Sequence, residues 1–185
     1  AWWAVGEAVN DPPPQIVFEE GGQFYPMVSA FMAAIPGLQS QLEPSNPMKM
    51  GEESVYTLVG KVHPELRLPT NAVRNLALAG KLDFTDIVNN LSVMLVNTAY
   101  ESVKDQNDQS SEFEFFRHIR NACSHRNRFN FNDAEPRRPA KWRTLAIDHG
   151  LKGSANPLHN AQCFGPFIAT ADAILLLWDV EQKLQ

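Results

Sequence analysis

The sequence has few cysteines and no long apolar run. Its 185 residues include only two cysteines, Cys123 and Cys163, which are too few for a disulfide framework. The longest uninterrupted apolar run, 173–178, has six residues, whereas a membrane-spanning helix needs about 18 to 20. Residues 1–5 lack the basic start and the length of a secretory signal, and prolines follow at 12–14. We therefore expect a reduced, cytoplasmic protein without a membrane segment.

The chain also lacks an overall positive charge, which argues against a protein that coats nucleic acid with its whole surface. With 16 Lys and Arg against 21 Asp and Glu, the formal net charge is -5. Residues 117–143, however, contain eight basic and two acidic residues, so this segment carries +6 and the remainder carries -11. This asymmetry predicts a local surface for an anionic partner.

Apolar residues recur at helical spacing along most of the chain, and this pattern predicts an all-α fold. The expected helices lie at 24–35, 70–80, 84–104, 111–128 and 167–184, and residues 55–62 form a short helix or a strand. Pro36 and Gly37 should end the first helix, because proline removes a backbone donor. Ser111 and Glu114 have the spacing of a capping box and should open the helix at 111–128.

These elements suggest an antiparallel bundle of four to five main helices. Residues 129–163 are rich in Pro, Gly, Asn and Arg, so we expect an irregular insert between the last two helices, with a short strand within 142–147. Residues 1–50 would form an N-terminal arm and a first helix packed on the bundle, and residues 51–185 the main helical domain.

The helix expected at 111–128 separates an apolar side from a polar one. Projected at about 100° per residue, its apolar side chains fall together. On the other side fall six polar residues, with no carboxylate among these six: Arg117, Arg120, Asn121, Ser124, His125 and Arg128. Arginine binds phosphate through two parallel hydrogen bonds, and histidine transfers protons near neutral pH. Such a face can be merely solvated, but the lack of acidic partners one turn away favours an anionic ligand.

Residues 120–125, Arg-Asn-Ala-Cys-Ser-His, resemble the signature of the HEPN domain family: an arginine, a polar residue and, a few residues later, a histidine on a helix of an all-α bundle. The resemblance covers about residues 50–185 and points to HEPN proteins of plasmid and defence systems. It implies a metal-independent endoribonuclease, with no cofactor, in which two copies pair through the motif helix and form one composite active site. It further implies RNA as the substrate, a toxin or defence role and an antitoxin as a possible partner.

The same resemblance implies roles for single residues. One His125 would take the proton of the ribose 2′-OH and the other would protonate the leaving 5′-oxygen, giving 2′,3′-cyclic phosphate and 5′-OH ends. Arg120 would stabilise the charge that develops at phosphorus, and Asn121 would orient His125 or the scissile phosphate. The residues expected to bind flanking phosphates or bases are Arg117, Ser124, Arg128 and Trp142.

One position departs from the family pattern. In toxins controlled by a nucleotidyltransferase, the histidine is often followed, after one residue, by a tyrosine that is modified. This chain has Asn127 at that position, so we do not expect that form of control here.

Other interpretations remain open at this stage. The domain could be a non-catalytic HEPN module that binds RNA or nucleotide, or that only dimerises. Cys123, His125, His159 and Cys163 could hold zinc, but Cys123 falls on the apolar side of its helix, and we expect no metal.

Three single residues also have more than one interpretation. His118 could lie at the edge of the polar face, but we expect it to be an exposed surface residue. Trp142 could pack the insert onto the helices instead of stacking on a base. Asp172 could cap the last helix, pair with an arginine of the motif helix or face solvent.

Overall fold

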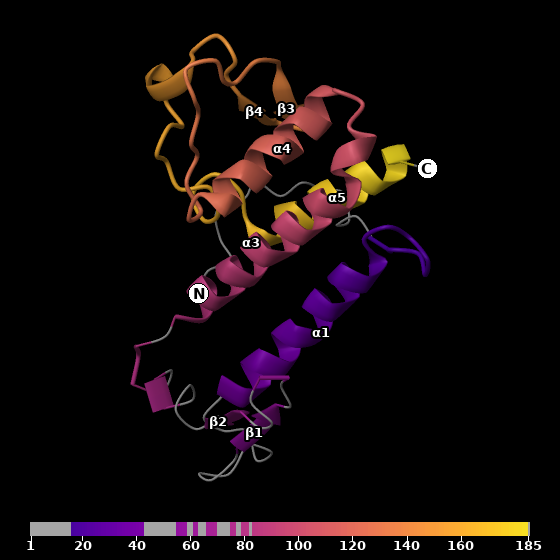
Figure 1. Cartoon of the computed structure of the whole chain (residues 1–185), viewed down its shortest axis with the longest axis vertical. Helices are drawn as coiled ribbons and strands as arrows, with labels where there is room; N and C mark the ends of the chain where they lie inside the picture. Colours follow the sequence, from indigo (N-terminus) through magenta and orange to yellow (C-terminus); the bar gives the residue numbers. More distant parts are fainter. Residues whose placement is uncertain are drawn as a thin grey trace, which may run out of the picture.

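The computed structural model describes residues 16–42, 55–58, 61–62, 66–69, 75–76, 79–81 and 83–184. These residues form mainly helices, as predicted (Figure 1): α1 (Tyr25–Leu42), α3 (Phe84–Val103), α4 (Ser111–Ser124) and α5 (Thr170–Leu184), with the short 3-10 helices η1 (Lys104–Gln106) and η2 (Gly153–Ala155). None of the helices in this described part of the chain is long and apolar enough to cross a membrane.

Two small antiparallel hairpins complete the fold: β1 (Val55–Leu58) pairs with β2 (Leu66–Pro69), and β3 (Ala140–Trp142) pairs with β4 (Leu145–Ile147). Of the two interpretations of residues 55–62, the strand is therefore correct over 55–58, and its partner strand was not foreseen. The helix expected at 70–80 and the boundary expected at residue 50 fall mostly outside the described residues, so both stay predictions.

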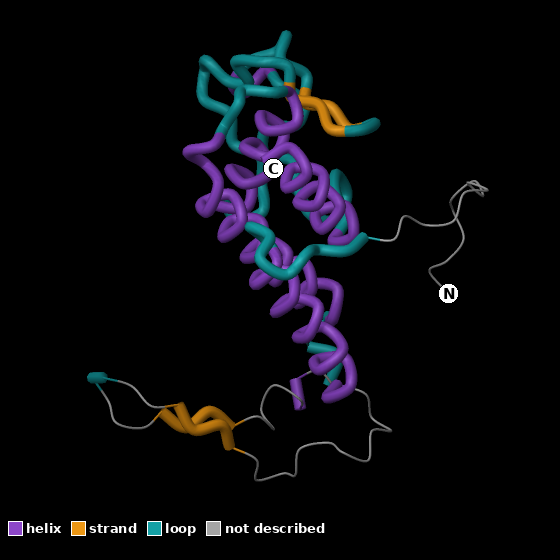
Figure 2. Tube along the Cα trace, turned by 90° about the vertical axis from the view of Figure 1, so that its right-hand side faces the viewer, coloured by secondary structure: helices purple, strands orange, loops and turns teal. Residues whose placement is uncertain are grey.

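Helix α3 occupies the centre of the arrangement, in contact with α1, α4 and α5. Figure 1 shows α1 along one side of α3 and α4 on the other, and Figure 2 shows the same elements after a quarter turn. Asp83 caps α3, because its side chain accepts a hydrogen bond from the Thr85 amide at 2.8 Å.

Helix α1 continues through Pro36 to Leu42, so the prediction that it ends before Pro36 is wrong. A proline inside a helix costs about 3 kcal/mol through a lost hydrogen bond and a steric clash. The lost bond runs from residue 36 back to residue 32, so the residues after Pro36 keep their own amide donors and the helix can continue. The buried residues Phe24, Val28 and Phe31 all precede the exposed Pro36, and their packing stabilises the turns before the proline.

Helix α4 begins and ends at residues other than those predicted. Its cap is Ser110, whose hydroxyl accepts from the Phe113 amide at 3.2 Å, and not Ser111. The helix ends at Ser124 instead of Arg128, because Arg126 and Asn127 have φ values of 59° and 61°. A left-handed backbone conformation cannot continue a right-handed helix.

Two adjacent phenylalanines of α4 join the helical core to the insert. The ring of Phe116 meets Tyr100 of α3 at a centroid distance of 5.3 Å and Phe24 at 6.4 Å. The ring of Phe115 meets Trp142 of β3 at 5.9 Å. Because both phenylalanines are fully buried, α4 is held from two sides, and its polar face has a defined direction.

Candidate functional site

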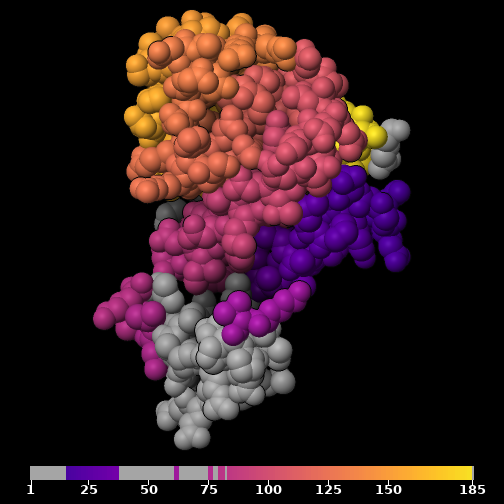
Figure 3. All heavy atoms as spheres, viewed as in Figure 1, coloured from indigo at the N-terminus to yellow at the C-terminus, as the bar shows by residue number. Residues whose placement is uncertain are grey.

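The C-terminal turn of α4 brings together four residues predicted to form the site. Arg120 and Asn121 are partly exposed, Ser124 is exposed on the next turn, and His125 is the exposed C-cap. Helix α3 lies beside this turn, and the hydroxyl of Ser124 donates to the side-chain oxygen of Asn97 at 2.8 Å. In the space-filling view, the surface of α4 and of the residues after it borders that of α3 (Figure 3). The site therefore lies on two helices, not on one.

The guanidinium of Arg120 is held by neighbours from both helices. Its Nη2 donates to Oε1 of Glu101 on α3, and its Nη1 donates to Oδ1 of Asn121 at 3.2 Å. The group also lies over the ring of Tyr100, 5.5 Å from the centroid. Its Nε atom is buried and has no hydrogen-bond partner among the described residues. Glu101 was missed by the sequence reasoning, because it lies 19 residues before Arg120 on another helix.

His125 is oriented by a residue that the sequence reasoning also missed. Its Nδ1 lies 3.3 Å from Nδ2 of Asn130. An amide nitrogen can only donate, so a neutral His125 in this arrangement has its proton on Nε2. Asn121 was expected to orient His125 or the scissile phosphate, and its side-chain oxygen accepts from Arg120.

Arg117 does not belong to the exposed face. Its Nε and Nη2 donate to the two oxygens of Glu114 at 3.0 and 2.7 Å, and its Nη1 donates to Glu135 at 2.8 Å. With two carboxylates around it and 21% of its side chain exposed, this arginine has no free edge for a phosphate. The expectation that Arg117 binds RNA therefore disagrees with its position.

His118 belongs to the same buried group, so the prediction that it is exposed is wrong. It is 1% exposed, its Nε2 lies 3.4 Å from Oε1 of Glu114, and its ring meets Phe131 edge-on at 5.4 Å. Burial alone would raise the pKa of Glu114, but hydrogen bonds from His118 and Arg117 outweigh it and lower this pKa to about 2. The expected lack of acidic partners one turn away is therefore wrong for Arg117, because Glu114 lies three residues before it on the same helix.

The two remaining predicted contacts have different positions. Arg128 is exposed and donates through Nη1 to the carbonyl of Asn160 at 2.7 Å. Trp142 is only 3% exposed, and its Nε1 donates to Asp179 of α5 at 2.7 Å. This matches the interpretation in which Trp142 packs the insert onto the helices, because a buried indole offers no face to a base.

Asn127 and Asp172 stabilise the loop before α5 and its first turn. The Asn127 side chain accepts from the Phe164 amide at 2.7 Å and donates to the Phe164 carbonyl at 3.2 Å. Asp172 accepts from the Ala169 amide at 2.9 Å, which corresponds to the capping interpretation. Neither side chain is directed to the exposed turn of α4.

The cysteines are buried, and the four possible zinc ligands do not come together. Burial raises the pKa of the Cys123 thiol to about 12, and it raises that of Cys163 as well. Within the described residues, no group of three or more His, Cys, Asp or Glu side chains is placed to hold a metal ion.

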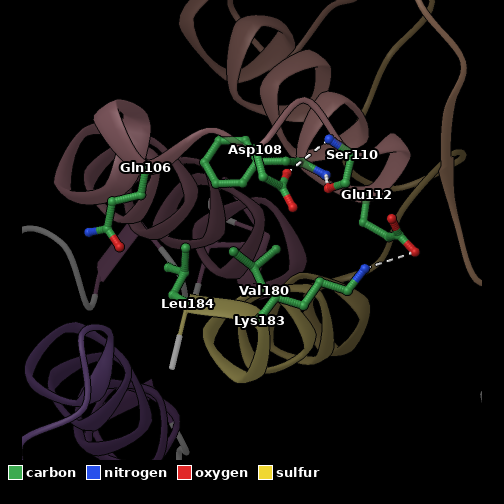
Figure 4. Close-up of a pocket in the computed structure, with 8 residues that line it drawn as sticks. Gln106, Asp108, Ser110, Glu112, Val180, Lys183 and Leu184 are labelled. Carbon is green, nitrogen blue, oxygen red and sulfur yellow. Dashed lines mark hydrogen bonds and ion pairs between the residues drawn. The ribbon is translucent and has the colours of Figure 1, made fainter.

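A small cavity of about 30 Å³ lies at the other end of α4, and Figure 4 shows its lining. Ser110, Glu112 and Phe113 contribute from the start of α4, and Val180 and Lys183 from α5. Glu112 and Lys183 form an ion pair at 3.1 Å beside it. No residue predicted for the site lines this cavity, and its distance from His125 along α4 is about 20 Å.

Ion pairing reduces the basic surface that the sequence suggested. Of the eight basic residues in 117–143, three pair with carboxylates: Arg117, Arg120 and Arg143. The other five are exposed and have no ion pair with a described residue: Arg126, Arg128, Arg137, Arg138 and Lys141. Of these, Arg126 directly follows His125, and Arg128 lies three residues after it.

Comparison of the chain with protein-family models, with curated proteins and with solved structures finds no match.

Proposed function

We propose that this protein is a metal-independent endoribonuclease of the HEPN type. The observation that supports this best is the exposed C-terminal turn of α4, which places Arg120, Asn121, Ser124 and His125 on one surface next to Arg126 and Arg128. Arginine, amide, hydroxyl and imidazole groups can bind a phosphodiester and move its protons.

In the proposed reaction, the ribose 2′-oxygen attacks the neighbouring phosphorus while His125 takes its proton. The bond from phosphorus to the 5′-oxygen breaks, and a second histidine gives a proton to that oxygen. The products are a 2′,3′-cyclic phosphate and a 5′-OH end. Arg120 stabilises the additional negative charge on the phosphoryl oxygens, and Asn121 keeps the Arg120 guanidinium in place through its side-chain oxygen.

The reaction needs a base and an acid, and the exposed turn of α4 offers one histidine, His125. We therefore propose that the active species is a homodimer. Each chain is an antiparallel helical bundle, and the two chains pair through their α4 helices. Ser124, Arg126 and Arg128 bind flanking phosphates, whereas Arg117 and Trp142 are left out of this site. A cytoplasmic toxin or defence role, with an antitoxin as a further partner, is part of the same proposal.

A second candidate is a non-catalytic module that binds RNA. One observation favours it: the Arg120 guanidinium is already engaged by Glu101 and Asn121, so it is not free in the isolated chain. Such a module would bind RNA through Arg126 and Arg128 and would leave it intact. Cleavage therefore separates the two candidates.

The test incubates the purified full chain with single-stranded and structured RNA in the presence of EDTA. Wild type should cleave and leave 2′,3′-cyclic phosphate ends, and the variants His125→Ala and Arg120→Ala should lose at least about a hundredfold in rate. His149→Ala, an exposed histidine in the insert, is the matched control and should retain activity. Light scattering on the same samples should give the mass of a dimer.

Four results would contradict the proposal. Intact RNA in all samples would favour the binding module. Cleavage that survives both His125→Ala and Arg120→Ala would exclude this site, and cleavage that requires added metal would exclude the mechanism. A strict monomer that cleaves RNA would exclude the composite site.

A further inference from the structure

The two arginines of α4 that pair with carboxylates do so in different ways. Arg117 uses both Nε and Nη2, the two donors of one guanidinium edge, to bind both oxygens of Glu114. Arg120 uses Nη2 of the same edge to bind one oxygen of Glu101, while its Nε has no partner among the described residues. Both donors of this edge are therefore bonded in Arg117, but only one of the two is bonded in Arg120.

A guanidinium edge with one unbonded donor is an incomplete binding site for an oxyanion. Arginine binds carboxylate and phosphate with the same fork of two parallel N–H groups, so a carboxylate oxygen on Nη2 takes the place of a phosphate oxygen. Nε is buried while Glu101 is bound to Nη2, and a buried N–H group without a partner is unfavourable. A phosphate that displaced Glu101 and also reached Nε would accept from both donors, whereas Glu101 accepts from one.

Glu101 also has a second partner, which can still bind its carboxylate after the carboxylate leaves Arg120. Lys104, three residues further along, donates to the other carboxylate oxygen of Glu101 at 2.8 Å. Glu101 has 42% of its side chain exposed, so it can rotate without disturbing the core. Hydrogen bonds from Lys104 and Arg120 lower the pKa of Glu101, and the carboxylate is therefore ionised at neutral pH.

We propose that Glu101 is an internal competitor of RNA: its carboxylate occupies Arg120 in the free protein, and a phosphodiester of the RNA displaces it. This inference rests on the proposed function, because it takes Arg120 as the phosphate ligand. It goes beyond that function because it gives Glu101 of α3 the role of lowering RNA affinity. RNA binds at Arg120 only when a phosphate replaces the Glu101 carboxylate.

The test measures binding of an RNA that cannot be cleaved. A fluorescent single-stranded 2′-O-methyl oligonucleotide lacks the attacking hydroxyl, so its affinity can be measured by anisotropy at a series of salt concentrations. Glu101→Gln should bind about three to ten times more tightly than wild type. The slope of log Kd against log salt should also become steeper by about 0.7, because in the variant Arg120 neutralises one additional phosphate, whereas in wild type the phosphate only replaces a carboxylate on Arg120.

Glu112→Gln is the matched control. It removes a carboxylate of comparable exposure that pairs with Lys183 at the far end of α4. The affinity and salt slope of this variant should stay close to those of wild type. In an Arg120→Ala background, Glu101→Gln should have little further effect, since the two residues act on the same phosphate. Thermal unfolding of each variant establishes that it is folded.

The outcomes separate the two proposals. If Arg120→Ala binds as tightly as wild type, the proposed phosphate site is wrong. If Arg120→Ala binds weakly but Glu101→Gln gains no affinity, only the competitor role is wrong. Loss of cleavage in Glu101→Gln at unchanged affinity would overturn it too, because Glu101 would then position Arg120 instead of competing for it.

Discussion

Glu114 and Arg117 face each other across one turn of α4 and share two parallel hydrogen bonds, at 3.0 and 2.7 Å. A second carboxylate, Glu135, reaches the same guanidinium from the insert at 2.8 Å. This ion pair therefore ties the insert to α4. An arginine whose sequence position suggests an RNA contact thus has a structural role.

We expect Arg117→Met to destabilise the protein by about 3 to 5 kcal/mol. The substitution leaves two carboxylates, Glu114 and Glu135, without their partner, and an uncompensated buried charge is strongly unfavourable. Urea unfolding at pH 7 measures the change. Arg138→Met is the control, since this exposed arginine has no ion pair with a described residue, and its effect should stay within about 0.5 kcal/mol. Equal stability of both variants would show that the ion pair is not important.

The pKa of Glu114 predicts how stability depends on pH. It falls from 4.5 to about 2 on folding, so the stabilisation from this carboxylate is present above about pH 4.5 and is lost as the pH falls towards 2. The shift corresponds to about 3 kcal/mol, and the raised pKa of Arg117 describes the same contact. Urea unfolding of wild type and Glu114→Gln between pH 2 and 7 should show a difference at neutral pH that shrinks in acid. A difference independent of pH would contradict this assignment.

Asn127→Ala should cost about 2 kcal/mol. It removes the two hydrogen bonds to the backbone of Phe164, and it places alanine at a φ of 61°, where asparagine is tolerated better. Asn127→Gly removes the same bonds without the backbone penalty and should be less destabilising than alanine. Thermal unfolding measures both variants. If alanine and glycine were equally harmless, the contact with Phe164 would not hold the loop.

Asp179→Ala should destabilise the packing of the insert against α5. The Asp179 carboxylate accepts from the buried indole of Trp142 and from Arg143, and its loss leaves the indole N–H without a partner, at a cost of about 1 to 3 kcal/mol. Asp179→Asn keeps an acceptor and should cost less. Hydrogen exchange at β3 and β4 should be faster in the alanine variant. Asp105→Ala, at an exposed position in η1, should leave this exchange unchanged, and an equal response of both variants would contradict the prediction.

The sequence predicted features that depend on local interactions. The start of α3 at Asp83 follows from a capping side chain, and the helical class follows from apolar spacing. The exposed end of α4, with Arg120, Asn121 and Ser124, follows from the same periodicity. Such signals act within a few residues, so they can be read without knowledge of the rest of the chain.

Other features were beyond local signals. Helix α1 continues past Pro36, where the local signal predicted its end. Helix α4 stops at Ser124, and the loop that follows takes its shape from contacts with Phe164. A helical projection gives the direction of a side chain, but it does not identify the residues of other elements that contact this side chain.

The sequence by itself determined a mainly helical protein with one amphipathic helix whose polar side combines Arg120, Asn121 and His125. Only the tertiary structure decided which of its basic residues stay available. Glu135 and Glu101 lie 18 and 19 residues from the arginines they bind, on other elements of the fold. Because a charge is neutralised by whatever packing brings within hydrogen-bonding distance, the spacing of residues along one helix does not identify its partners.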